Sequence, residues 1–174
     1  MKNTIYLLII ALSSCTSNSN VKQDVNNTFE KDLEKYENIW TQFLSGDTTV
    51  INETNFHQDV VVVTSNGNLV GIDAIKDFYM NYLNGFDNIE FTIIDAFGQG
   101  DRIVKHWNFK GTHTGNFFGI PATGNKLNLS GTTLVTMTES KVKKEQDFFD
   151  MQSLVDQLKK PHTDGVVIDD YMGI

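Results

Sequence analysis

The sequence predicts an α+β fold in which helices close one side of a single, strongly curled antiparallel sheet. Apolar residues recur every three or four positions in segments 29–44 and 72–82, which is the pattern of an amphipathic helix. From Asn88 onward the apolar period becomes two, as in strands with one buried face. A curled sheet closed by helices leaves a conical cavity between the layers, and the 11% aromatic content is enough to line it.

Composition limits the classes of protein that the chain can represent. The 174 residues are 40% hydrophobic and 21% charged, which is typical of one globular domain. A net charge of −8 argues against nucleic acid as a partner, because phosphate binding needs a basic surface. One cysteine and four scattered histidines predict no dedicated metal site, and no motif for a nucleotide or another cofactor is present.

The N-terminus has the features of a secretory signal. Lys2 is followed by the apolar run 5–12, which is too short to span a bilayer, and then by small residues that end in Cys15. This pattern resembles the lipobox of bacterial lipoproteins, in which cleavage leaves the cysteine as a lipid-modified N-terminus. We therefore expect a signal peptide at 1–14, a membrane anchor at Cys15, a polar tether at 15–28 and a domain facing the periplasm or the exterior. A plain signal peptide with an incidental cysteine is the alternative.

The elements of the domain, residues 29–160, are expected in the order helix, short strand, helix and four-strand meander. Segment 45–47 ends the first helix, and the β-branched run 60–64 forms a strand that leads into a turn at Asn66-Gly67. Gly71 precedes the second helix. The later elements are strands at about 88–97, 102–112, 126–138 and 141–149, a helix at 151–159 and a tail at 161–174.

Three stretches of the chain resemble the SnoaL-like polyketide cyclase (ester cyclase) family of the NTF2-like superfamily. They are GIDAIKDFYMNYLNGFDNIEF, GQGDRIVKHWNFKGTHTGNFFGIPATGNKL and KVKKEQDFFDMQSLVDQL, and the similarity covers about residues 30–158. The resemblance implies an NTF2-like cone and a cofactor-free aldol closure that uses one acidic side chain in the cavity. By position, that acid is Asp150. Relatives usually have Glu and Trp where this chain has Lys144 and Gln146, and some cyclases have His where it has Thr136.

Asp150 and His113 are the catalytic candidates. Alternation along the last strand puts Asp150 on one face with Val142, Lys144, Gln146 and Phe148. If that face lines the cavity, desolvation raises the pKa of the Asp150 carboxyl. The alternative is that Asp150 only caps the last helix. His113 could bind a substrate oxygen or pair with Asp150, or it could instead stabilise the glycine-rich turn.

A ligand pocket is expected between the sheet and the helices, although the same aromatic residues could simply pack the core. Lys105 is expected at the sheet rim with an exposed stem, a buried amine of depressed pKa being the other possibility. Asp95 and His106 are expected at the surface, a second acid of the cavity being the alternative for Asp95. The predicted pocket residues are Trp40, Phe78, Tyr82, Trp107, Phe109, Phe118, Thr136, Gln146 and Phe148.

Two functions of different classes follow from these features. The first is a lipid-anchored protein that binds a small, mostly apolar, oxygenated molecule and performs acid–base chemistry of the cyclase, isomerase or hydrolase type. The second is a non-catalytic binding lipoprotein, favoured by the predicted export and by Thr136, Lys144 and Gln146. A homodimer through the open sheet face, which carries several threonines, is a further possibility.

Overall fold

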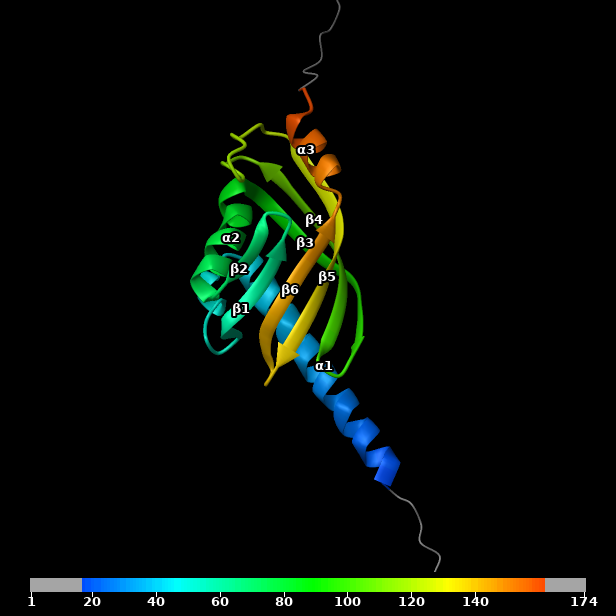
Figure 1. Cartoon of the computed structure of the whole chain (residues 1–174). Coiled ribbons are helices and arrows are strands. Elements are labelled where there is room, and N and C mark those ends of the chain that lie inside the picture. The colour runs from blue at the N-terminus through cyan, green and yellow to red at the C-terminus, as the bar shows by residue number, and fades with distance from the viewer. Residues whose placement is uncertain (1–16, 162–174) are drawn as a thin grey trace, which may run out of the picture.

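Six strands form one mixed, curled sheet in the order β2-β1-β6-β5-β4-β3 (Figure 1). The structure is a computed structural model that describes residues 17–161, with side chains from 28 onward. Strands β1 and β6 run parallel, and every other neighbouring pair is antiparallel. The strands are β1 (Phe56–Thr64), β2 (Gly67–Val70), β3 (Phe86–Gln99), β4 (Arg102–His113), β5 (Lys126–Thr138) and β6 (Lys141–Phe149).

The predicted α+β architecture is confirmed, including the meander from β3 to β6. The sequence analysis missed two features. Strand β2, which pairs with β1 after the turn at Asn66, was not predicted. The parallel pairing of β1 with β6 was also missed, because it joins segments about 80 residues apart and local periodicity carries no information on it.

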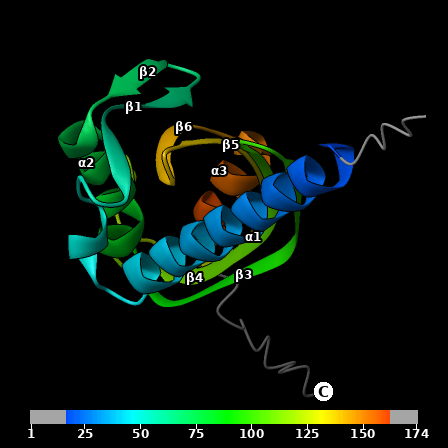
Figure 2. The same ribbon diagram turned by 90° about the horizontal axis from the view of Figure 1, so that it is seen from below.

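Helices cover the concave side of the sheet. Figure 2 shows α1 (Ser17–Leu44) crossing the open side of the curl, with α2 (Ile72–Gly85) beside the β1–β2 hairpin. Tyr36, Trp40 and Phe43 of α1 are buried at the helical spacing that the sequence predicts. A short 3₁₀ helix (Thr48–Val50) follows α1, and α3 (Met151–Lys159) packs at the far end of the sheet.

The first helix begins earlier than expected. It starts at Ser17, inside the segment that the sequence analysis assigns to a polar tether, so residues 17–28 are helical rather than weakly structured. The predicted signal peptide at 1–14, the lipidation site Cys15 and residues 162–174 of the predicted tail lie outside the described residues. Within 17–161, no helix is both long and apolar enough to cross a bilayer.

One irregularity in β6 decides which side chains face the concave side. Val142 lies opposite Met137 of β5, whereas Lys144 lies opposite Thr136, so that Lys143 is an extra residue in β6. Such a bulge interrupts the alternation of faces and increases the local twist of the strand. Val142 and Glu145 are therefore both fully buried, although strict alternation would have put them on opposite faces.

Candidate active site

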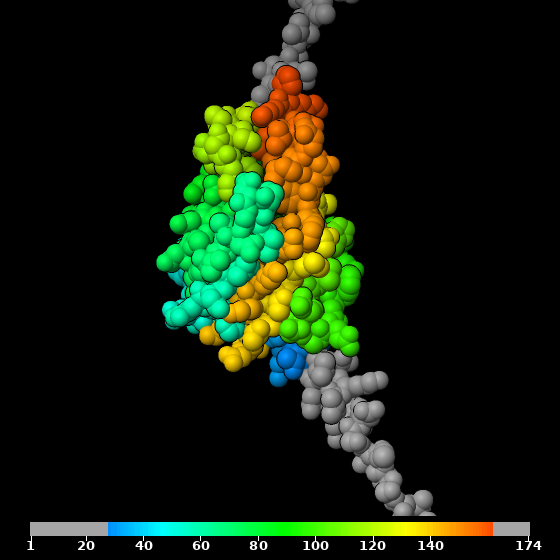
Figure 3. Space-filling view, in the orientation of Figure 1, coloured from blue at the N-terminus to red at the C-terminus, as the bar shows by residue number. Residues whose placement is uncertain are grey.

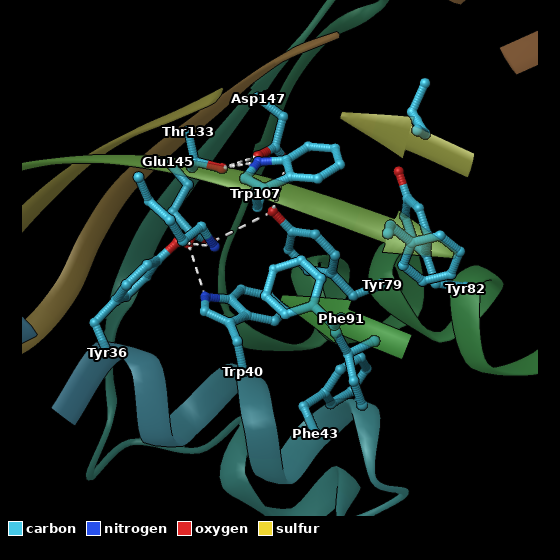
Figure 4. A pocket seen from close by; sticks show the side chains of 14 residues that line it. Tyr36, Trp40, Phe43, Tyr79, Tyr82, Phe91, Trp107, Thr133, Glu145 and Asp147 are labelled. Atoms are coloured by element: carbon cyan, nitrogen blue, oxygen red, sulfur yellow. Dashed lines mark hydrogen bonds between the residues drawn. The ribbon is translucent and has the colours of Figure 1, made fainter. Parts of the chain in front are cut away.

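A cavity, here called the inner cavity, lies between the concave face of the sheet and helices α1 and α2 (Figure 4). It encloses about 520 Å³ between its lining atoms, including the space that opens to solvent. Only about 50 Å³ of that space is open to the centre of a water molecule, so the cavity is narrow. Its lining residues are Tyr36, Trp40, Phe43, Leu44, Tyr79, Tyr82, Phe91, Lys105, Trp107, Phe109, Leu129, Thr133, Glu145 and Asp147.

Glu145 is the most deeply buried acid of the inner cavity, with none of its surface exposed. Tyr36 and Trp40, one turn apart on α1, both donate to its Oε1; the Trp40 Nε1 to Oε1 distance is 3.2 Å. The Tyr79 hydroxyl lies 3.3 Å from Oε2. Burial raises the pKa of this carboxyl to about 7, although nearby Lys105 opposes the shift. The group can therefore gain or lose a proton near neutral pH.

Asp147 is the second acid of the inner cavity, two residues further along β6. Its Oδ1 accepts from the Thr133 hydroxyl, and its Oδ2 lies 3.2 Å from the Tyr79 hydroxyl. Trp107 Nε1 in turn donates to Thr133 Oγ1 at 2.9 Å. Tyr79 contacts both carboxylates, so the two acids share one neutral donor and form a continuous polar lining inside an otherwise aromatic cavity.

Glycine at position 131 makes room for the indole of Trp107. A Cβ atom at Gly131 would lie 2.4 Å from Trp107 Cζ2 and 2.8 Å from the Phe148 carbonyl oxygen, which is closer than real Cβ atoms approach. The indole therefore crosses β5 over a residue without a side chain. This close approach allows Trp107 to reach Thr133 and to wall one side of the inner cavity.

A wider depression, here called the outer groove, adjoins the inner cavity. It encloses about 1500 Å³, including open solvent, and shares Tyr82 and Asp147 with the inner cavity. In Figure 3 its walls are the turquoise β1–β2 hairpin, the yellow-green loop around residue 118 and the orange start of α3. Phe118 (φ 45°) and Gly119 (φ 85°) form a left-handed turn that leaves the Phe118 ring half exposed over this groove.

The structure brings together seven of the nine predicted pocket residues, in two groups. Trp40, Tyr82, Trp107 and Phe109 line the inner cavity, and Phe78, Phe118 and Phe148, again with Tyr82, line the outer groove. The predicted placement of Thr136 and Gln146 is wrong, because neither lines a described pocket. Both alternate with buried neighbours on their strands and lie on the opposite side of the sheet.

The predicted cavity position of Asp150 is also wrong. Its side chain is exposed and accepts from Ser153 N at 2.9 Å, so it caps α3, which is the alternative that the sequence analysis kept open. The bulge at Lys143 explains the difference, because it turns Glu145 and Asp147 inward in place of Lys144 and Gln146. Alternation counted through an unbroken strand could not reveal this.

His113 is buried at the end of β4, outside both described pockets. Its Nδ1 lies 3.0 Å from Thr123 Oγ1, and its backbone bonds to Asn125 and Gly124, so it stabilises the glycine-rich turn. Burial lowers the pKa of its imidazole, which favours the neutral ring. The structure shows no bond between His113 and Asp150 among the described residues.

The position of Lys105 also differs from the one expected. It was expected on the rim, yet only 4% of it is exposed and its amine faces the inner cavity. Asp95 and His106 are at the surface, as predicted. In the part of the chain that the structure describes, no group of three His, Cys, Asp or Glu side chains could hold a metal ion.

Glu145 and Asp147 are the functional candidates that sequence reasoning missed. A signal for them existed in the alternation of β6 read backward from Phe149, which gives 149, 147 and 145 as one face. Alternation counted forward from Val142 puts 142, 144 and 146 on one face instead. The two counts agree only if β6 contains an extra residue, and the sequence alone does not show where that residue lies.

Comparison with known proteins agrees with the fold. The family model for SnoaL-like polyketide cyclases matches residues 33–158. No curated protein matches the chain. A solved structure from Jannaschia sp. CCS1, described as a putative SnoaL-like polyketide cyclase, is 20% identical, with a TM-score of 0.71, and the match covers 76% of this chain and 94% of the other.

Two further solved structures share the fold. AclR from Streptomyces galilaeus, described as a putative hydroxylase, is 17% identical with a TM-score of 0.66, over 76% of this chain and 83% of its own. TerC, co-crystallised with polyporic acid, is 19% identical with a TM-score of 0.60, over 74% and 98%. Since the family model spans most of the domain, the chain belongs to the SnoaL-like polyketide cyclase family.

Proposed function

We propose that the chain binds a small, mostly apolar, oxygenated molecule and passes a proton to or from it through Glu145, with Asp147 as its partner. The observation that carries this proposal is a buried carboxyl, with a pKa of about 7, in the wall of an aromatic cavity. Such a group can take a proton from a carbon next to a carbonyl and return it elsewhere, which is the step shared by aldol closure and isomerisation. No cofactor is needed for that step.

The two compartments suggest the shape of the ligand. The inner cavity admits only a small reactive group, while the larger apolar body would lie in the outer groove against Phe78, Phe118 and Phe148. Tyr82 and Asp147 stand where the two spaces meet. The co-crystallisation of TerC with polyporic acid supports a small organic ligand for this fold.

The proposal is tested with β-tetralone, an apolar ketone whose α-protons exchange with solvent. In deuterated buffer, proton NMR should show faster exchange in the presence of the protein. Glu145→Gln should lower the protein-dependent rate by about 10²–10⁴-fold, the usual contribution of a general base. Because the base must be ionised, the rate should rise with pH and level off above about 7.

The variant Asp150→Asn distinguishes the proposed base, Glu145, from Asp150, the acid that the family resemblance implies. The carboxyl of Asp150 lies at the surface, so this variant should keep the exchange rate of the unaltered chain. Loss of exchange in Asp150→Asn, with Glu145→Gln fully active, would contradict the proposed role of Glu145.

The second candidate is a binding protein without catalysis. It is favoured by the hydrogen bonds inside the cavity, where donors of this chain already occupy the carboxylate oxygens of Glu145 and Asp147. In that case the fluorescent probe phenylnaphthylamine should bind to the unaltered chain and to Glu145→Gln alike, Trp107→Ala should weaken its binding, and no variant should affect tetralone exchange. The homodimer expected from the sequence stays a prediction.

A further inference from the structure

A buried amine faces the two acids of the inner cavity. Lys105 lies on β4, where it pairs with Ala96 of β3 and Thr133 of β5, and its side chain lines the inner cavity beside Glu145. Lysine is rarely this buried unless it is paired with a carboxylate. The proton transfer proposed above does not use Lys105, so its position needs a separate explanation.

The surroundings of Lys105 hold the amine without an ion pair. Its Nζ donates to the Tyr36 hydroxyl at 3.2 Å and lies 4.6 Å, 5.4 Å and 5.2 Å from the ring centres of Tyr36, Trp40 and Phe91. Among residues 28–161, no carboxylate oxygen lies within 4.0 Å of this nitrogen. Burial lowers the pKa of the amine, and the charges of Glu145 and Asp147, together with that of Glu37, oppose this shift.

We propose that Lys105 is a covalent binding site for aldehydes and ketones, which it would hold as a Schiff base in the inner cavity. Amines in desolvated pockets are nucleophilic enough for this chemistry because a larger share of them is uncharged. The proposal rests on the proposed function only in that the inner cavity must admit a small organic molecule. It adds a reaction that the acids of the cavity could not perform alone.

The residues around Lys105 can supply and remove the protons of the reaction. The neutral amine adds to the carbonyl carbon, the C=O π electrons move to oxygen, and a proton shift gives a carbinolamine. Glu145 in its protonated form then donates to the hydroxyl group, which leaves as water while the nitrogen lone pair forms the C=N bond. Tyr36 touches both Lys105 and Glu145, so it can relay a proton between them.

The product would be stabilised by the same site. A protonated Schiff base carries one positive charge, and the carboxyl groups of Glu145 and Asp147 line the space that it would occupy. The faces of the Tyr36, Trp40 and Phe91 rings, which lie near the amine, favour a cation at that place. Charge and ring geometry therefore both favour the iminium form over release of the carbonyl compound.

Reductive trapping tests this inference on the unaltered full chain. The protein is incubated with benzaldehyde and sodium cyanoborohydride, whose hydride, with a proton from water, reduces the C=N bond to a stable benzylamine. Peptide mapping by mass spectrometry then measures the benzylation rate of each lysine. Lys105 should react at least about ten times faster than exposed Lys110 of the same strand, because burial lowers the pKa of the Lys105 amine and leaves a larger share of it uncharged.

Matched variants complete the test. Lys105→Met should abolish the fast adduct, whereas Lys110→Met, which removes an exposed amine, should leave it unchanged. Glu145→Gln should slow the adduct by removing the proton donor. If phenylnaphthylamine binds to the cavity while Lys105 reacts no faster than Lys110, the covalent site is wrong and the proposed ligand pocket stands. If the probe does not bind and Lys105 stays unmodified, both proposals are wrong.

Discussion

Glu145 illustrates how a single carboxyl takes its chemistry from its surroundings. Tyr36, Trp40 and Tyr79 donate to it from two helices, and none of these contacts is close in sequence. The donors favour the ionised form and burial favours the neutral one, and burial is the larger effect. Sequence reasoning identified Trp40 as a cavity residue but could not identify the acid that it binds, because that pairing depends on tertiary contacts alone.

The raised pKa of Glu145 predicts how stability depends on pH. Between pH 4.5 and about 7 the unfolded chain loses this proton while the folded chain keeps it, so the free energy of unfolding should fall as the pH rises through that window. The expected loss is about 3 kcal/mol, at about 1.4 kcal/mol for each unit of pKa.

Urea denaturation at a series of pH values measures this effect. Glu145→Gln keeps a neutral acceptor for Tyr36 and Trp40 and cannot ionise, so its stability should change less over the same window. Parallel pH profiles for the two proteins would show that the pKa of Glu145 is not raised in the folded state.

At the scale of elements, local patterns predicted the bounds of several strands and helices, but they did not predict the irregularities of strand pairing. The bounds of β5, β6 and α3 agree with the prediction, because period, turn residues and the cap at Asp150 are local signals. The bulge at Lys143 and the β1–β6 pairing have no such signal. The pocket aromatics were therefore mostly found, while the two acids, Glu145 and Asp147, were missed.

The contact between β5 and the Trp107 indole predicts a specific packing defect. Gly131→Ala places a methyl group against the indole and should destabilise the fold by about 1–3 kcal/mol, the usual cost of overpacking. Thermal unfolding measures the loss, and tryptophan fluorescence reports the moved ring. Adding Trp107→Phe removes the indole part of the clash, although the Phe148 carbonyl oxygen stays in place, so the double variant should be more stable than the sum of the single effects implies. Simple additivity would show that the contact with the indole is unimportant.

For the whole molecule, the N-terminal pattern predicts attachment to a membrane through lipid. The chain has a net charge of −8, so charge would not hold it to an anionic bilayer. Expressed in a bacterial host, the protein should fractionate with membranes, and mass spectrometry should find an acylated Cys15 as its first residue. Cys15→Ser should move it to the soluble fraction. An unmodified chain that begins at Met1 would contradict the anchor.

The extra residue in β6, Lys143, connects the shape of the inner cavity with the acids that line it. The same local twist that helps to curl the sheet over a hollow also rotates two acids into that hollow, so shape and acidity depend on one position. A homologue without this extra residue would have a less curled sheet. In the same chain, Lys144 and Gln146 would face the cavity in place of the two acids. Natural selection on this position would therefore act on the curvature of the sheet and on the acidity of the cavity together.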